Sequence, residues 1–434
     1  MPAWLDTRDT GFEAAFTALL AARHETTDGV DDTVAAILAD VKANGDVAVI
    51  AHTKRLDGFD VTPATMRVPT DVVKRAAGAC LPETVEALEL ARDRITDFHR
   101  RQMPEDLDYT DGAGFSLGLR WKPLASVGLY VPGGTAAYPS TVLMNAVPAK
   151  IAGVQRVVMV VAAPGGQINP LVLAAADIAG VDEIYRIGGA QAVGALAFGT
   201  PTIARVDKIV GPGNVYVAAA KRQVFGIVGI DMIAGPSEIL VVADRFNDPA
   251  WIAADLLAQA EHDIAAQAIL VADDKDFAEA VTEAIQAHLS TLPRAGIAAQ
   301  SWETFGAVIL MESLADAGPL IDRIAPEHLE LAVEEPETLA ATVCNAGAIF
   351  LGRFAPEAIG DYVAGPNHVL PTAGSARFSS GLGVLDFLKR TSLIGCNRES
   401  LAAVAPAAVA LAKAEGLDAH ALSLALRLNR PQDT

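Results

Sequence analysis

The sequence predicts an α/β protein with two units, each built around a parallel β-sheet. The first observation is length, since a chain of 434 residues is too long for one typical hydrophobic core. The second is composition: 51% hydrophobic residues, with 36 Gly and 24 Pro, are typical of a compact globular protein. The third is that short β-branched runs alternate with longer helical patterns, because parallel strands need crossover connections. We therefore expect two Rossmann-like domains with smaller helical N- and C-terminal parts.

Residues 1–121 are expected to form a mostly helical N-terminal region. Apolar residues recur at helical spacing in Phe12–Arg23, Asp31–Asn44 and Pro82–Arg100. No cluster of chemically reactive side chains stands out there. We expect this region to support the fold by packing on the second α/β unit.

Residues 122–236 and 237–376 are expected to form the two α/β domains. The strands predicted in the first are Ser126–Val131, Arg156–Ala162, Glu183–Ile187 and Asp207–Val210. Its predicted helices are Ser140–Ala152, Pro170–Ala179, Ala190–Phe198 and Asn214–Phe225. The strands predicted in the second are Ile239–Ala243, Ala268–Ala272, Ala307–Met311 and Ala348–Leu351. Open parallel sheets bind ligands outside the carboxyl ends of their strands, so we expect functional groups in the loops that follow strands.

Residues 377–434 are expected to form a loop and a helical tail. The chain becomes irregular and polar beyond Gly352, and a long loop in a compact protein is usually functional. Ser400–Leu428 has an Ala-rich helical pattern with predicted breaks at Pro406 and Gly416. This tail is too small to hold a core of its own, so we expect it to pack on another domain or another subunit.

Charge and cysteine content exclude several classes of function. The formal net charge of -20 argues against nucleic acid and anionic membranes as partners, because these are bound by clustered Lys and Arg. The three cysteines, Cys80, Cys344 and Cys396, lack the paired spacing of a zinc or disulfide motif. The N-terminus has no basic segment followed by an apolar stretch, and no apolar run is long enough to span a bilayer. We expect a cytoplasmic protein.

Three glycine clusters could approach a dinucleotide. They are Val131-Pro-Gly-Gly134, Ile187-Gly-Gly-Ala-Gln191 and Gly211-Pro-Gly-Asn214, each between a predicted strand and a predicted helix. Glycines there allow a backbone to come close to a phosphate, and helix N-termini favour its charge. None completes the dinucleotide fingerprint, and tight turns explain the pattern about as well. Tyr130 and Asn214 could contact a cofactor or could take part in ordinary turns.

Two short motifs suggest a metal and proton transfer. Gln259 and His262 share one helix face near the end of a predicted helix, which suits a metal, although a polar helix end explains them slightly better. Glu327 and His328 lie between a predicted helix and a short strand, and burial can move the pKa of both groups towards neutrality. A capped helix end with solvated side chains is a fair alternative, because adjacent strand side chains point to opposite faces.

The remaining histidines divide by context. His24, His52, His99 and His288 occupy polar positions in helical patterns and are expected at the solvated surface. His368 shares the irregular loop with Asp361, and Glu415 and His420 lie in the tail. Taken together, Gln259, His262, Asp361 and His420 form a set of N and O donors suited to zinc.

Six segments, in order along nearly the whole chain, resemble the histidinol dehydrogenase family. They are Gly128-Leu-Tyr-Val-Pro-Gly-Gly134, Ala234-Gly-Pro-Ser-Glu238, Gln259-Ala-Glu-His-Asp263, Pro326-Glu-His-Leu-Glu330, Gly365-Pro-Asn-His-Val-Leu-Pro371 and Glu415-Gly-Leu-Asp-Ala-His420. The resemblance implies that Gln259, His262, Asp361 and His420 bind zinc and that Glu327 and His328 are the catalytic acid–base pair. It implies substrate contacts at Ser237, His368 and Glu415, in addition to Gln259, His262, His328, Asp361 and His420. It also implies NAD contacts at Tyr130, Gln191 and Asn214.

The resemblance further implies a homodimer in which the C-terminal tail of one subunit, the dimerisation tail, completes the active site of the other. The expected reaction is the NAD-dependent oxidation of L-histidinol to L-histidine through L-histidinal, in two hydride transfers that end histidine biosynthesis. A related enzyme that oxidises another small alcohol, such as a sulfonated diol, is the nearest alternative. A nucleotide-binding regulator that has lost the chemistry is a second alternative. Aldehyde oxidation through a cysteine thiohemiacetal is disfavoured, because none of the three cysteines has a catalytic partner beside it in sequence.

Overall fold

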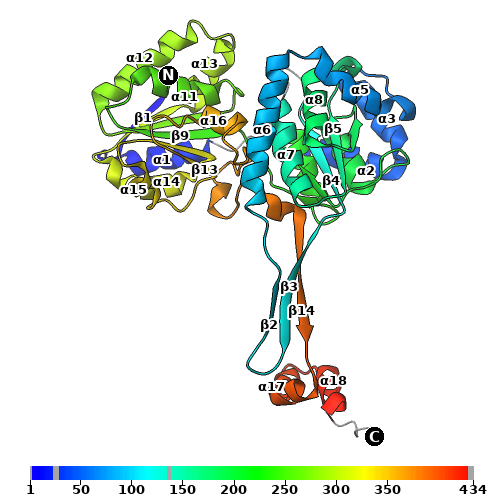
Figure 1. Ribbon diagram of the computed structural model, residues 1–434. Helices are drawn as coiled ribbons and strands as arrows, with labels where there is room; N and C mark the ends of the chain where they lie inside the picture. The colour runs from blue at the N-terminus through cyan, green and yellow to red at the C-terminus, as the bar shows by residue number, and fades with distance from the viewer. Residues whose placement is uncertain (1, 23–28, 134–137, 429–434) are drawn as a thin grey trace.

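The computed structural model describes residues 2–22, 29–133 and 138–428. It has two α/β units side by side and a long arm that projects from them (Figure 1). The predicted α/β class with two parallel sheets is confirmed. No helix within the described ranges is long and apolar enough to cross a membrane.

The first unit has a five-stranded parallel sheet in the order β6-β5-β4-β7-β8. Its strands are β4 (Ser126–Val131), β5 (Arg156–Val161), β6 (Glu183–Tyr185), β7 (Lys208–Val210) and β8 (Gly229–Ile230). Its crossover helices are α7 (Pro139–Ile151), α8 (Pro170–Ala179), α9 (Gly189–Phe198) and α10 (Val215–Val224). β4 and β5 are buried except at their first residues, as a parallel sheet covered on both faces requires.

The second unit has a six-stranded parallel sheet in the order β1-β11-β10-β9-β12-β13. Its strands are β1 (Ala3–Asp6), β9 (Glu238–Ala243), β10 (Gln267–Ala272), β11 (Ala307–Leu310), β12 (His328–Ala332) and β13 (Ala348–Leu351). Its helices are α1 (Phe12–Ala21), α11 (Pro249–Ala260), α12 (Lys275–Leu289), α13 (Ala295–Phe305), α14 (Gly318–Ile324), α15 (Pro336–Ala340) and α16 (Glu357–Tyr362). Strand β1 was not predicted, because four residues give too short a pattern.

The N-terminal region divides between the two units, so its expected packing on the second unit is wrong for the larger part. Within the described part of this region, only β1 and α1 lie on the second sheet, where Leu5, Phe12 and Phe16 join its core. Residues from Val34 to Met66, and from Val68 to Ile95, belong to the two cores of the first unit. The helices concerned are α2 (Val30–Asn44), α3 (Asp46–Asp57), α4 (Pro63–Met66), α5 (Thr70–Arg75) and α6 (Pro82–Arg100). His99 in α6 is fully buried, contrary to expectation, and its Nδ1 donates to the Ile95 carbonyl at 2.8 Å.

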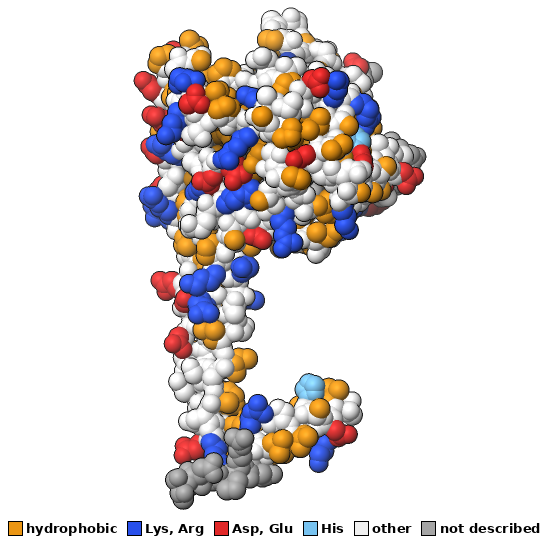
Figure 2. All heavy atoms as spheres, turned by 90° about the vertical axis from the view of Figure 1, so that its right-hand side faces the viewer, with side chains coloured by type: hydrophobic (Ala, Val, Ile, Leu, Met, Phe, Trp, Pro, Cys, Tyr) orange, Lys and Arg blue, Asp and Glu red, His pale blue; other side chains and the backbone are white. Residues whose placement is uncertain are grey.

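The arm is a three-stranded antiparallel sheet that ends in two helices. Strand β3 (Ser116–Pro123) lies between β2 (Leu107–Thr110) and β14 (Leu388–Gly395). Helices α17 (Arg398–Ala414) and α18 (Asp418–Leu428) follow, and Figure 2 shows the arm as a narrow projection with hydrophobic side chains along it. The strands were missed because nearly all residues of β2 and β14 are exposed, so burial imposes no alternating pattern.

The expected break at Pro406 is also wrong, because α17 continues through it. Proline removes one internal hydrogen bond, which costs least in a largely exposed helix whose freed carbonyl is available to water. The break at Gly416 does occur, and its φ of +72° is in the left-handed region that glycine tolerates.

Candidate active site

The two residues of the Glu327–His328 motif are brought together on one partner, Glu238, the first residue of β9. Helix α14 ends at Ile324, and the next residue, Ala325, has a φ of +47° that turns the chain towards β12. The backbone N–H of Glu238 donates to Glu327 Oε2 at 2.9 Å, and His328 Nδ1 donates to the Glu238 carbonyl at 2.9 Å. Glu327 Oε2 and His328 Nδ1 are 3.7 Å apart. Adjacent side chains therefore converge, because Glu327 precedes the strand and only His328 is part of it.

The hydrogen bond to Glu238 also determines which nitrogen of the His328 ring carries the proton. A carbonyl can only accept, so Nδ1 carries the proton and Nε2 keeps its lone pair. Burial lowers the pKa of His328 to about 4, so the ring is neutral near pH 7. Burial also raises the pKa of Glu327 well above its ordinary value. A neutral imidazole can accept a proton, and a carboxyl with a raised pKa is a stronger base once it has lost its proton.

The predicted metal ligands of this chain also lie close together, except His420. Gln259, in the last turn of α11, is fully buried and donates from Nε2 to His262 Nδ1 at 2.9 Å. His262 Nε2 lies 3.8 Å from Asp361 Oδ2. Asp361 Oδ1 lies 3.5 Å from His368 Nδ1, which also donates to the Asp361 carbonyl oxygen at 3.0 Å.

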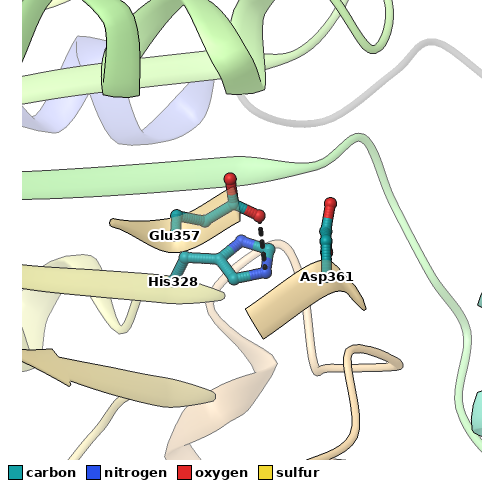
Figure 3. A group of neighbouring side chains, drawn as sticks. All are labelled: His328, Glu357 and Asp361. Carbon is teal, nitrogen blue, oxygen red and sulfur yellow. Dashed lines mark ion pairs between the residues drawn. The ribbon is translucent and has the colours of Figure 1, made fainter. Parts of the chain in front are cut away.

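A second cluster shares Asp361. Among the described residues, ligand atoms of His328, Glu357 and Asp361 all lie within 4.8 Å of one another (Figure 3). His328 Nε2 and Glu357 Oε1 are 3.7 Å apart. Sequence reasoning missed Glu357, although its position four residues before Asp361 places both on one face of α16.

The carboxyls of α16 have opposite pKa shifts. Burial, with the nearby charge of Asp361, raises the pKa of Glu357 to about 9. Burial opposes ionisation of Asp361 too, but its hydrogen bond to His368 and the nearby His328 and His262 outweigh burial and lower its pKa. Glu357 is therefore the protonated partner and Asp361 the charged one, as expected for two carboxyls in one site.

The location of this cluster corrects one expectation. Glu238 and His328 are the first residues of β9 and β12, so the cluster lies at the amino ends of the second sheet's strands and not at their carboxyl ends. The loop after α16 joins the cluster to the first unit, because Asn367 Nδ2 donates to the Met144 carbonyl of α7 at 2.6 Å. Ser237 immediately precedes β9 and is partly buried.

The predicted cofactor residues lie at the carboxyl ends of the first sheet's strands. Tyr130 is near the end of β4, and its hydroxyl accepts a hydrogen bond from the Gly189 N–H at 2.9 Å. Gln191 is fully buried, and neither its Oε1 nor its Nε2 has a hydrogen-bond partner. Asn214 Oδ1 accepts from the N–H groups of Tyr216 and Val217 at 3.1 and 3.2 Å, so this side chain caps α10. Gly134 lies outside the described residues.

Glu415 and His420 are not brought to the site of their own chain. Both are exposed near the end of the arm, in the turn between α17 and α18 and in α18. Figure 1 shows this end of the arm far from α16 and β9.

Comparison with known proteins agrees with the family that the sequence resembles. The model of the histidinol dehydrogenase family matches residues 20–428. The chain is 63% identical over 431 residues to the histidinol dehydrogenase of Rhodospirillum rubrum and 60% identical over 430 residues to that of Ruegeria pomeroyi, covering 99% of each protein. A crystal structure of histidinol dehydrogenase from Elizabethkingia anophelis has a TM-score of 0.93 and 34% identity, over 98% of both chains. Since sequence and fold agree from end to end, arm included, the chain belongs to the histidinol dehydrogenase family.

Proposed function

We propose that this protein oxidises L-histidinol to L-histidine through L-histidinal, using NAD in two successive hydride transfers. The name shared by its relatives designates a dehydrogenase of histidinol, which supports histidinol oxidation and a role in histidine biosynthesis. The observation that carries the proposal is the buried pair of Glu327 and His328, both bonded to Glu238 beside Asp361. This pair offers two proton-transfer groups to one reacting carbon.

Gln259, His262 and Asp361 fit a zinc ion. The Gln259 Oε1 atom is buried without a hydrogen-bond partner, which is costly unless a ligand satisfies it. Imidazole nitrogen and carboxylate oxygen are ordinary zinc donors, and His262 already faces Asp361. When bound, zinc would supply a Lewis acid that holds the amine and imidazole nitrogens of the substrate.

Asp361 could instead share a metal with His328 and Glu357. We favour the set with Gln259 and His262, because a base needs His328 Nε2 free. In our assignment Glu357 does not bind the metal and lies beside Asp361, one turn earlier in α16.

NAD fits the loops of the first sheet. Gln191 has two buried polar atoms without partners beside the glycines that follow β6. The N-terminus of α10, capped by Asn214, favours a negatively charged phosphate nearby. When bound, NAD would accept one hydride in each oxidation.

His328 would take a proton in both oxidations. In the first, its Nε2 would accept the hydroxyl proton of histidinol, and the product is the aldehyde. Glu327 would then deprotonate a water molecule that adds to the aldehyde, while His328 would return its proton to the aldehyde oxygen, so that the hydrate forms and His328 is again neutral. In the second, His328 would accept a proton from the hydrate as hydride leaves, and the resulting carboxylic acid would release its own proton to give the carboxylate of histidine. Formation of the carboxylate makes the two-step oxidation effectively irreversible.

The arm suggests a homodimer with shared active sites. His420 would complete the zinc ligands of the other subunit, and Glu415 would contact its substrate along with Ser237 and His368. His420 and Glu415 lie far from the candidate site of their own chain (Figure 1), so they could contribute only to the site of another chain. Several leucines of α17 and α18 are more than half exposed, which fits a segment buried by a partner.

A direct test is an end-point assay with limiting L-histidinol and excess NAD. We expect two reduced NAD per histidinol consumed and about one zinc per chain. One reduced NAD per substrate would restrict the reaction to alcohol oxidation. Turnover of a sulfonated diol but not of histidinol would refute the substrate, and NAD binding without any turnover would favour the regulatory alternative.

A further inference from the structure

A buried ion pair contacts the glycine loop that follows β7, residues Gly211–Asn214. Lys221 of α10 is paired with Asp231, which follows β8, and their side chains are only 3% and 1% exposed. Removing two charges from water is costly unless additional hydrogen bonds compensate, so a buried ion pair is weak evidence for a role in stability alone. The contacts that the pair makes with the backbone indicate its role.

Both members of the pair bind the same loop residue, Gly211. Lys221 Nζ donates to the Gly211 carbonyl at 2.9 Å, and the Gly211 N–H donates to Asp231 Oδ2 at 2.7 Å. The pair therefore satisfies both polar groups of one backbone position. A salt bridge between two elements holds the first residue of a loop from both sides.

Gly211 occupies a position that only glycine can take. Its φ is +108°, and a Cβ atom there would lie 2.2 Å from the carbonyl oxygen of Tyr130. The loop is thus pressed against the end of β4. Its other end, Asn214, caps α10. Tyr130 and Asn214 are the proposed NAD contacts on either side of this close approach.

Asp231 also begins the segment that leads to the catalytic pair. Residues 231–238 connect the first sheet to β9, and their path is fixed at two further points. The Gly235 N–H donates to Thr372 Oγ1 at 2.6 Å, and Glu238 binds both Glu327 and His328. One short connector therefore joins the glycine loop to the proton-transfer groups.

We propose that Lys221 and Asp231 are positioning residues for the cofactor: their ion pair holds the Gly211–Asn214 loop where NAD binds. The inference rests on the proposed function, since it requires NAD at this loop. The substrate end of the connector has its own anchors at Thr372, Glu327 and His328. Loss of the ion pair should therefore weaken NAD binding more than histidinol binding.

The test compares Lys221→Met with the double variant Lys221→Met/Asp231→Asn in the full-length protein. Methionine keeps the length of the side chain but cannot bind Gly211, and the second change removes the unpaired buried charge. We measure Tm, the Kd of NAD by titration calorimetry, and the KM for each substrate. Both variants should raise the Kd and KM of NAD at least about tenfold, with the KM of histidinol within about twofold. The double variant should recover Tm but not NAD affinity.

A matched control is Arg156→Met/Glu183→Gln. This ion pair, with N–O distances of 2.9 and 3.1 Å, belongs to the same sheet but lies at the amino ends of β5 and β6. We expect a lower Tm with an unchanged Kd of NAD. A general effect of losing an ion pair would raise the Kd in the control as well and would overturn the inference.

Three further results would also overturn it: unchanged NAD affinity in the double variant, recovery of NAD affinity together with Tm, or an equal rise of both KM values. Asp231→Asn alone retains an acceptor for the Gly211 N–H and can be used if the other variants do not fold. An unchanged Kd of NAD in that variant would also overturn the inference. Wild-type protein that neither binds NAD nor oxidises histidinol would refute the proposed function itself.

Discussion

His328 derives its proposed role from one hydrogen bond and from burial. The Glu238 carbonyl selects the tautomer with a free Nε2, and burial keeps the ring neutral. Both effects come from the position of His328 at the start of an inner strand, paired with β9 on one side and β13 on the other. A histidine at the solvated surface would have neither property.

The lowered pKa of His328 predicts a dependence of stability on pH. The folded protein protonates His328 only near pH 4, whereas the unfolded chain does so near 6.5. The unfolded state binds more protons between these values, so stability falls as pH falls from 6.5 to 4. Relative to His328→Asn, whose amide can still donate to Glu238, the metal-free wild type should lose about 3 kcal/mol over this window. Urea unfolding at several pH values measures it, and parallel curves for both proteins would contradict it.

Glu327→Gln should separate the two oxidations. The amide keeps an oxygen for the Glu238 N–H but cannot deprotonate water, so the fold and the first oxidation should persist. Oxidation of added L-histidinal should fall between about 10²- and 10⁴-fold. Stopped-flow measurement of NAD reduction from each substrate provides the comparison. Equal losses on histidinol and histidinal would assign Glu327 to both steps.

At the residue scale, sequence could identify the groups but not their surroundings. Gln259, His262, Asp361 and the Glu327–His328 pair stand in recognisable segments, and the fold brings them near one another. Glu238 and Glu357 were not assigned roles, because their importance arises from contacts across 90 and 29 residues of sequence with His328. Such contacts leave no local pattern.

Helix α10 raises a question at the scale of an element, because Asn214 is proposed to contact NAD and also caps the helix. Asn214→Ala should cost about 1 kcal/mol of stability through the lost cap. Asn214→Asp restores the cap but adds a negative charge where we propose that the phosphates of NAD bind. We expect Asn214→Asp to match wild-type stability and to weaken NAD binding, as measured by urea unfolding and NAD titration. Wild-type NAD affinity in both variants would leave Asn214 with a capping role only.

Elements with buried faces could be predicted, whereas exposed elements could not. β4 and α8 match their predicted ranges, because burial imposes apolar runs and helical periodicity on them. Strands β2 and β14 are held by pairing with β3 and not by burial, so their sequences resemble loops. The arm was therefore predicted only as a tail.

At the scale of the whole molecule, the main feature outside the two α/β units is the arm. It carries Glu415 and His420 away from the two units, whose cores contain no residue of α17 or α18. The proposed catalytic pair and three proposed zinc ligands, by contrast, belong to the second unit. A monomer would leave the proposed zinc site one ligand short, and a dimer with exchanged arms would complete both proposed sites.

Mixing two inactive variants tests this claim most directly. His262→Ala and His420→Ala homodimers should each be inactive. After unfolding and refolding together, a mixed dimer should contain one site with both His262 and the partner's His420 intact. At random assembly we expect about a quarter of wild-type activity to return. No recovery, with mixed dimers verified by mass spectrometry, would contradict an active site shared between subunits.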